Sequence, residues 1–189
     1  MKSSGKSKAV ADWLQKARES WSHTGQERPP FAVRPEKGQR SVWDFPRPPI
    51  IEKVNKPVLV NYQGKKVANS LNSLAVLETA SPPTYYIPKC DIDMDAVTKV
   101  SGKNSMCEWK GNAVYWALST MIERPVAWSY PKPFPEFEAL KDHIAFYPQN
   151  LECYVDGKRV VAQPGEFYAG WITPDLTGPF KGEKGTEHW

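Results

Sequence analysis

Apolar residues recur at spacings of three and four near the start of the chain. The stripe runs through residues 8–21 and consists of Val10, Trp13, Leu14, Ala17 and Trp21. This spacing places side chains on one face of an α-helix. We therefore predict an amphipathic helix over residues 8–21, which docks on the rest of the protein or on a second copy of the chain rather than on a membrane.

The helical pattern gives way to a polar, proline-rich stretch over residues 26–49. Proline fixes its own φ and lacks an amide hydrogen, so repeated prolines favour an extended arm over a helix. The sequence thus predicts two parts: an N-terminal helix with a proline-rich arm at residues 1–40, and a single β-rich domain at residues 41–189.

Short runs of β-forming residues, broken by turn residues, follow from residue 57 onward. Residues 58–68 and 151–160 each read as a strand, a Gly-Lys turn and a second strand, which predicts two similar hairpins and hints at an internal duplication. Further strands are expected at 83–88, 107–109, 113–118, 126–130 and 144–147.

One further helix is predicted at residues 135–142, where Pro135 suits the first helical turn. A chain of 189 residues has the size of one ordinary domain. The expected fold is mainly β: a small antiparallel sheet domain with one short core helix and the N-terminal amphipathic helix.

Composition and charge indicate the cellular compartment and the classes of partner that the sequence favours. The apolar runs are too short to cross a membrane, and no apolar segment follows the basic N-terminus as a secretory signal requires. Cys90, Cys107 and Cys153 are an odd, widely spaced set, which favours reduced thiols and a soluble, cytoplasmic protein. The net charge is +4, but the basic residues are scattered among 21 acidic ones, so nucleic acid is not the favoured partner.

The densest group of chemically distinctive side chains lies at residues 105–116. Lys110 stands between Trp109 and Gly111, where a tight turn could hold its ammonium beside aromatic faces and burial would lower its pKa. That arrangement suits an anion, a carbonyl or proton transfer; the alternative is a lysine that points outward from a hairpin turn. Cys107 is either a nucleophile beside this cation or an inert buried thiol.

Aromatic residues around this segment could form the walls of a pocket or belong to the ordinary core. Tyr115 and Trp116 are consecutive on a predicted strand, so they must face opposite sides of the sheet and at most one can enter a given pocket. The three histidines, His23, His143 and His188, lie far apart and the cysteines form no pairs. We therefore predict neither a metal site nor a cofactor.

The string Cys-x-Trp-Lys-Gly-x-Ala-x-Tyr-Trp at residues 107–116 is accompanied, in order, by further motifs at 41–49, 77–79, 82–88, 127–131, 145–148 and 170–182. Together they resemble Domain of Unknown Function family 427 over residues 41–189. The resemblance implies a small, mostly antiparallel β-domain with few helices, comparable to the β-tent folds of certain reductases and ligand-binding domains. The family is sometimes labelled nucleotidyltransferase-like, but the chain has neither the Gly-Ser with spaced aspartates of such enzymes nor a phosphate-binding glycine loop.

Three functions stay open on the sequence alone. The leading hypothesis is a small-molecule (metabolite) binding domain, in which Lys110 contacts the polar or anionic part of the ligand and Glu108 or Glu78 orients Lys110. The second is a small enzyme that uses Lys110 or Cys107 with assistance from Tyr130 or Tyr86. The third is an interaction protein that works through the N-terminal helix, or a homodimer formed there. The candidate ligand-binding residues are Tyr86, Cys107, Trp109, Lys110, Tyr115, Trp116, Trp128 and Tyr130.

Overall fold

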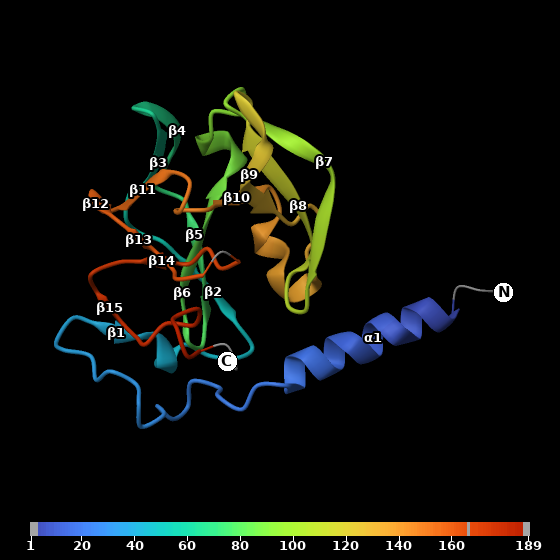
Figure 1. The fold of residues 1–189 in the computed structure, drawn as a ribbon, viewed down its shortest axis with the longest axis vertical. Coiled ribbons are helices and arrows are strands. Elements are labelled where there is room, and N and C mark those ends of the chain that lie inside the picture. Colours follow the sequence, from blue (N-terminus) through green and yellow to red (C-terminus); the bar gives the residue numbers. More distant parts are fainter. Residues whose placement is uncertain (1–3, 166, 187–189) are drawn as a thin grey trace.

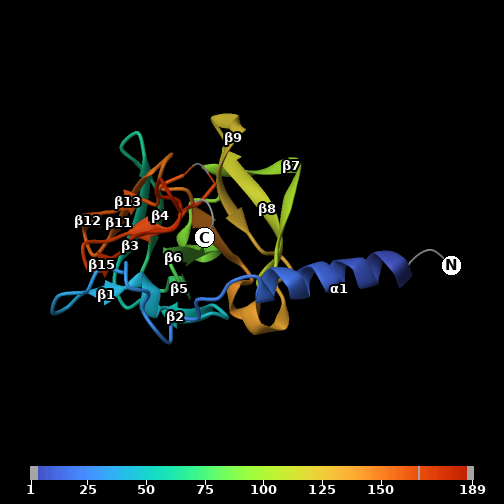
Figure 2. The same ribbon diagram turned by 60° about the horizontal axis from the view of Figure 1, so that its bottom comes forward.

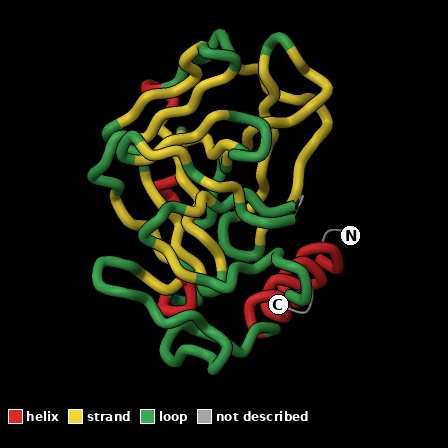
Figure 3. The backbone as a smooth tube through the Cα atoms, turned by 60° about the vertical axis from the view of Figure 1, so that its left-hand side comes forward, coloured by secondary structure: helices red, strands yellow, loops and turns green. Residues whose placement is uncertain are grey.

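Two antiparallel sheets form the centre of the protein, with α1 (Ser4–Glu19) projecting from one side (Figure 1). The structure is a computed structural model that describes residues 4–165 and 167–186. Strands account for most of the regular secondary structure in these residues, and α1 is the longest helix among them (Figure 3). The predicted fold class, mainly β and mostly antiparallel, is confirmed.

The larger sheet has seven strands in the described residues and is called the large sheet here. Each of its strands runs antiparallel to its neighbours. In spatial order they are β2 (Ile50–Lys53), β5 (Leu74–Glu78), β6 (Ser81–Pro88), β10 (His143–Phe146), β9 (Met121–Ser129), β8 (Gly111–Leu118) and β7 (Val97–Cys107).

The smaller sheet contains the two hairpins predicted from their Gly-Lys turns. Its order is β12 (Lys158–Arg159), β11 (Glu152–Val155), β3 (Val58–Tyr62) and β4 (Lys65–Ser70). The hairpins join through β3 and β11, where Val60 lies opposite Cys153. Two short pairs complete the strands: β1 (Arg40–Ser41) lies parallel to β15 (Leu176–Thr177), and β13 (Val161–Ala162) lies antiparallel to β14 (Trp171–Ile172).

The remaining helices in the described residues are short 3-10 turns: η1 (Val42–Asp44), η2 (Lys89–Asp91) and η3 (Pro135–Leu140). The helix expected at residues 135–142 is η3, in which Phe137 has a non-helical backbone with φ −117°. Phe137 and Leu140 are both buried. Docking of these two side chains stabilises a segment that is too short to hold an α-helix by itself.

The main core lies between the two sheets and includes the large side chains of Trp43, Phe45, Phe146 and Trp171. The indole of Trp43 donates to the carbonyl of Pro179 at 3.0 Å, and that of Trp171 donates to the carbonyl of Phe146 at 3.0 Å. Strand alternation on β6 separates this core from a second one. Tyr85 and Ile87 belong to the main core, and Tyr86 faces the opposite side of the large sheet.

The N-terminal helix begins and ends earlier than its apolar spacing predicts. It ends at Glu19, so Trp21 lies in the extended arm that follows it. The side chain of Val10, predicted on the apolar stripe, lies outside the described residues, and Trp13 is 47% exposed. The helix leads away from the sheets towards its N-terminus (Figure 2). No described helix has both the length and the apolar character needed to span a membrane.

Candidate functional site

A cavity of about 330 Å³ lies against the face of the large sheet that carries Tyr86. Its wall is built by strand alternation, because residues two apart on a strand share one face. The paired positions are Val76 and Glu78 on β5, Thr84 and Tyr86 on β6, Ser105 and Cys107 on β7, Ala113 and Tyr115 on β8, and Trp128 on β9 with Tyr130 just beyond it.

Three aromatic residues of this wall stand in one row across four strands. Tyr86 lies opposite Ala145, Ala145 lies opposite Trp128, and Trp128 lies opposite Tyr115. The rings of Tyr86 and Trp128 meet edge to face, with centroids 6.2 Å apart.

The turn between β7 and β8 brings Cys107 and Lys110 to the same cavity. Cys107 pairs with Gly111 across the turn, and Gly111 adopts φ +94°. A Cβ atom at Gly111 would come within 3.3 Å of the carbonyl oxygen of Lys132, so glycine suits both the conformation and the space. The amide of Phe134 donates to the carbonyl of Lys110 at 3.3 Å, which ties the turn to the segment before η3.

Lys110 lines the cavity, with its Nζ atom 5.8 Å from the ring centre of Phe137. Within residues 4–165 and 167–186, its ammonium forms neither a hydrogen bond nor an ion pair. Burial lowers the pKa of Lys110, but the nearby ionisable groups of Cys107, Tyr86, Glu78 and Glu108 outweigh burial and raise the pKa above its usual value. The lowered pKa expected from the sequence is therefore wrong. Lys110 is held as a cation.

Tyr86 is completely buried, and its hydroxyl has no hydrogen-bond partner among the described residues. Burial raises the pKa of Tyr86 from 10.0 to about 12, against the opposing effect of the Lys110 ammonium. Burial, followed by proximity to Tyr86 and Cys107, also raises the pKa of Tyr130 well above its usual value. Both phenols are neutral hydrogen-bond donors at physiological pH.

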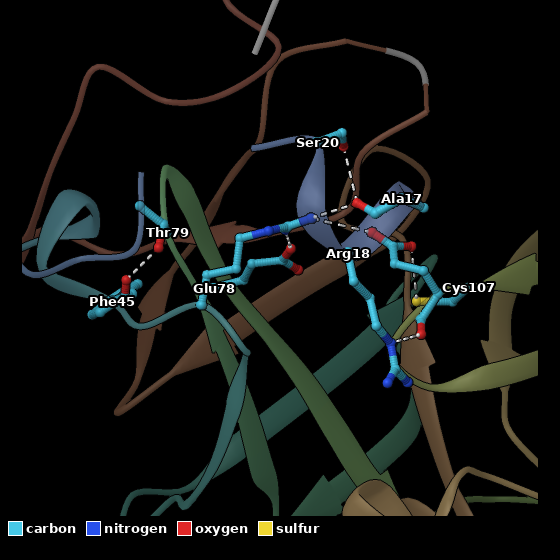
Figure 4. Close-up of polar contacts among 9 residues, drawn as sticks. Ala17, Arg18, Ser20, Phe45, Glu78, Thr79 and Cys107 are labelled. Atoms are coloured by element: carbon cyan, nitrogen blue, oxygen red, sulfur yellow. Dashed lines mark hydrogen bonds and ion pairs between the residues drawn. The ribbon is translucent and has the colours of Figure 1, made fainter. Parts of the chain in front are cut away.

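Cys107 is half-buried, and its Sγ atom lies 3.7 Å from Oε2 of Glu108. Glu108 and Glu78 are both bound by Arg47: Nη1 of Arg47 contacts Glu78, and Nη2 lies 3.6 Å from Glu108. Nη2 also donates to the carbonyl of Ala17, near the end of α1, at 3.3 Å. Arg47 thus connects the arm to the end of α1, to β5 and to the β7–β8 turn, and Figure 4 shows Ala17, Glu78 and Cys107 of these segments in the same region.

Trp109 packs away from the cavity, although the sequence placed it among the ligand-binding residues. The guanidinium of Arg18 lies 4.8 Å from the centre of its ring, and that of Arg47 lies 5.2 Å away. Arg18 also donates through Nε to the carbonyl of Glu108 at 2.8 Å (Figure 4). These two cations come from the helix and the arm, which the local sequence around Trp109 cannot reveal.

Trp116 is the second predicted residue outside the cavity. It faces the main core, and its indole donates to Oγ of Ser129 at 2.9 Å. Its neighbour Tyr115 lines the cavity, as strand alternation requires, and its hydroxyl lies 2.8 Å from Oγ of Ser105. The other predicted residues that line the cavity are Tyr86, Cys107, Lys110, Trp128 and Tyr130.

The sequence reasoning missed the cavity residues that come from the two ends of the chain: Trp21, Arg47, Gln163, Phe167, Tyr168, Ala169 and Lys181. Lys181 has its Nζ atom 4.5 Å from the ring centre of Trp21 and 5.8 Å from that of Tyr168. Burial lowers the pKa of Lys181 below its usual value, although Glu78 partly opposes this. The available signals were the family motifs at residues 41–49, which contain Arg47, and at 170–182, which contain Lys181, but neither motif indicates a role in a cavity.

No group of three His, Cys, Asp or Glu side chains in the described part of the chain is arranged to hold a metal ion. His188 lies outside the described residues. The chemistry available in the cavity is therefore that of ammonium and phenol donors, carboxylates, one thiol and aromatic faces.

The fold and the cavity define a small, mainly antiparallel β-domain with an aromatic-walled site. A family model described as a domain of unknown function (DUF427) matches residues 50–157, more than half of the chain. The protein belongs to this family. No curated protein matches it. The cavity residues supplied by the two ends of the chain all lie outside the matched range.

Proposed function

We propose that the protein binds a small organic acid in this cavity, with the acidic group at Lys110 and Tyr86. The observation that carries the proposal is that Tyr86, with a buried hydroxyl that has no hydrogen-bond partner, and Lys110, with an ammonium that forms no direct ion pair within the described residues, line the same aromatic cavity. This deepens the binding function favoured by the sequence.

The Tyr86 hydroxyl and the Lys110 ammonium are hydrogen-bond donors without acceptors among the described residues, so a ligand that supplies an acceptor is favoured. A buried polar group left without a hydrogen bond costs about 1–3 kcal/mol. A carboxylate or phosphate oxygen accepts hydrogen bonds from ammonium and phenol groups alike, and hydrogen bonds to charged groups are the stronger kind. Lys110 disfavours a cationic ligand at this end of the cavity.

The size and walls of the cavity suit a small, partly apolar ligand. Its volume of about 330 Å³ falls at the lower end of the range for small-molecule sites. The rings of Trp128 and Tyr147 pack in the wall at an interplanar angle of 53°, with centres 4.7 Å apart, and Tyr86 lies next to Trp128. Such faces favour a planar or apolar body.

The test compares three probes of the same shape: benzoate, benzamide and benzamidine. Binding is followed through the indole signals in ¹H–¹⁵N NMR spectra, since Trp21 and Trp128 line the cavity while Trp13 and Trp43 do not. We expect benzoate to shift the signals of Trp21 and Trp128 in a saturable way, with weaker binding of benzamide and the weakest of benzamidine.

Two variants that each remove one positive charge complete this test. Lys110→Met is expected to weaken benzoate binding by about tenfold or more, the effect of one charge-assisted hydrogen bond. Lys158→Met, at an exposed position in the β11–β12 hairpin, is expected to leave benzoate binding unchanged. Equal binding of the three probes, or a benzoate affinity that is unaffected by Lys110→Met, contradicts the proposal.

A second candidate function is covalent chemistry at Cys107, since this thiol shares the cavity with a fixed cation. Lys110, held as an ammonium, is not the nucleophile in such a reaction. An activated Cys107 would react with iodoacetamide faster than Cys90, which is exposed, and Cys153, which is buried. Slower alkylation of Cys107 than of Cys90 would leave ligand binding as the function of the site.

A further inference from the structure

We propose that the ligand carries two acidic groups, one held by Lys110 and Tyr86 and the other held by Lys181 and Trp21 on a separate wall of the cavity. This inference rests on the proposed function and adds the substrate class: a small diacid with an apolar centre. The second site is formed entirely by the chain ends that flank the family-matched region.

The backbone around Lys181 is held in place on both sides. Its amide donates to the carbonyl of Ala80 at 2.8 Å, and its carbonyl accepts from Nε2 of Gln163 at 2.7 Å. Its ammonium then lies over the ring faces of Trp21 and Tyr168. A lysine fixed in this way presents its charge to the cavity at low entropic cost.

The charges that line the cavity do not cancel. Its cations are Arg47, Lys110 and Lys181, and its carboxylates are Glu78 and Glu108. Arg47 forms ion pairs with both carboxylates. The three cations exceed the two carboxylates by one, and neither lysine forms a direct ion pair within the described residues, so both ammonium groups are open to contact with a ligand.

Each of these lysines is accompanied by a buried donor that lacks a partner among the described residues. Tyr86 supplies a hydroxyl beside Lys110, and Trp21 supplies an indole N–H beneath Lys181. The two donors come from β6 and from the arm after α1, and they belong to different core clusters. A carboxylate or phosphate group at each lysine would satisfy one donor at each place.

The pKa of Lys181 supports this arrangement. Burial depresses it, because the carboxylates near Lys181 do not fully compensate for lost hydration. An anion bound directly to the ammonium would reverse the depression. The anion would then be bound most tightly at a pH where Lys181 is fully protonated.

The experiment is isothermal titration with diacids and their singly neutralised isosteres. The probes are isophthalate, terephthalate and para-phenylenediacetate, in which the second carboxylate lies at increasing distance, and the corresponding monoamides. We expect at least one diacid to bind about tenfold or more tightly than its own monoamide, the gain from a second charge-assisted contact.

Variants then show which residue is responsible for the gain in affinity of a diacid over its monoamide. Lys181→Met is expected to abolish the gain, so that this variant binds each diacid no more tightly than its monoamide, and Lys181→Arg is expected to retain part of the gain. Lys110→Met is expected to weaken diacid and monoamide alike, and Lys158→Met should affect neither. Thermal unfolding of each variant establishes that it folds.

Two outcomes overturn the inference: a diacid that binds no more tightly than its monoamide at any of the three lengths, or a gain that survives Lys181→Met. If monoamides and benzoate bind through Lys110 but no diacid shows a gain, the proposed function stands and the second acidic site is wrong. If none of the acids binds, both are wrong.

Discussion

Buried aromatic residues in this protein fall into two kinds that differ in how their polar atoms are satisfied. Trp43 and Trp171 are fully buried in the main core, and each donates its indole N–H to a backbone carbonyl. Tyr86 is equally buried, but this residue lines a cavity and its hydroxyl has no partner within the described chain. Trp109 also has a buried indole N–H without a partner there, but it lies outside the cavity, so Tyr86 is a candidate ligand contact because it combines an unsatisfied hydroxyl with a place in the cavity wall.

Tyr86→Phe is therefore expected to leave the free energy of unfolding unchanged at neutral pH or to raise it by up to about 1 kcal/mol, because it removes an unsatisfied buried hydroxyl. Trp171→Phe, which breaks a satisfied hydrogen bond and leaves a void in the main core, should lower it by about 2 kcal/mol or more. Urea unfolding followed by circular dichroism measures both values.

The stabilities of the wild type and of Tyr86→Phe should depend differently on pH in alkaline solution. The pKa of Tyr86 rises from 10.0 to about 12 on folding, so the neutral phenol is favoured in the folded state. This contribution to stability is fully present below pH 10 and is lost as the pH rises towards 12. Over that window the wild type should lose roughly 2 kcal/mol relative to Tyr86→Phe. A parallel pH dependence of the two proteins would contradict the assignment, and Tyr154→Phe, on β11, serves as the control.

For single residues, the sequence predicts the position of a side chain correctly where its neighbours along the chain determine that position. Strand alternation correctly assigned Tyr115 and Trp116 to opposite faces. The prediction failed where distant segments contribute: Arg18 and Arg47 cover Trp109, and Tyr86 and Glu78, together with the nearby Cys107 and Glu108, outweigh burial and raise the pKa of Lys110. Lys181 could not be found, because nothing near it in the sequence indicates a cavity.

The β7–β8 turn is the element that positions the candidate site, and its glycine is required for two reasons. Gly111 combines φ +94° with the close approach of the carbonyl of Lys132. We expect Gly111→Ala to lower the free energy of unfolding by about 2 kcal/mol and to displace Lys110. Gly102 also has positive φ, +73°, but has open space around it, so Gly102→Ala should cost only about 1 kcal/mol. Equal losses in thermal unfolding would show that the close approach has no effect.

The proline-rich arm is held to the large sheet by Arg47, whose side chain is 11% exposed. Arg47→Met would leave Glu78 and Glu108 partly buried without their cation, and we expect a loss of about 2–4 kcal/mol. Arg28→Met removes an ion pair with Asp44 in which both side chains are 41% exposed, and it should lower the free energy of unfolding far less than Arg47→Met does. Chemical denaturation of the two variants tests this difference, and losses of similar size would argue against the role of Arg47.

Element types followed from the sequence better than element ends. The spacing of apolar residues correctly indicated the N-terminal helix, but Trp21 continues that spacing beyond Glu19 and lies in the arm. Its tertiary contacts with Lys181 and with His23 decide its position. Likewise, the segment at residues 135–142 is a 3-10 turn, because burial of Phe137 and Leu140 outweighs helix propensity.

On the scale of the whole molecule, the family-matched region is not a structural unit by itself. Trp43, Phe45 and Trp171 are fully buried in the main core and lie outside residues 50–157. We expect a fragment of residues 50–157 to show no cooperative unfolding transition, since it lacks these side chains and β12, the strand that pairs with β11. Near-ultraviolet circular dichroism and urea titration of the fragment measure this. A cooperative transition at the urea concentration of the full chain would contradict it.

The sequence predicted the fold class and both glycine-turn hairpins, because these depend on residues close together along the chain. It could not predict the order of strands in the large sheet. β6 pairs with β10, where Ile87 lies opposite Ile144, and no local pattern indicates such a distant partner. The comparison with β-tent folds and the homodimer stay predictions.

The central claim is that the cavity holds an organic acid through Lys110. The most direct measurement is mass spectrometry of the purified protein under native and denaturing conditions, carried out for the wild type, Lys110→Met and Lys158→Met. We predict a non-covalent acid that adds mass to the wild type and to Lys158→Met under native conditions, is released on denaturation and is absent from Lys110→Met. A wild-type native mass equal to that of the chain alone, or an added mass retained equally by Lys110→Met, would contradict the account.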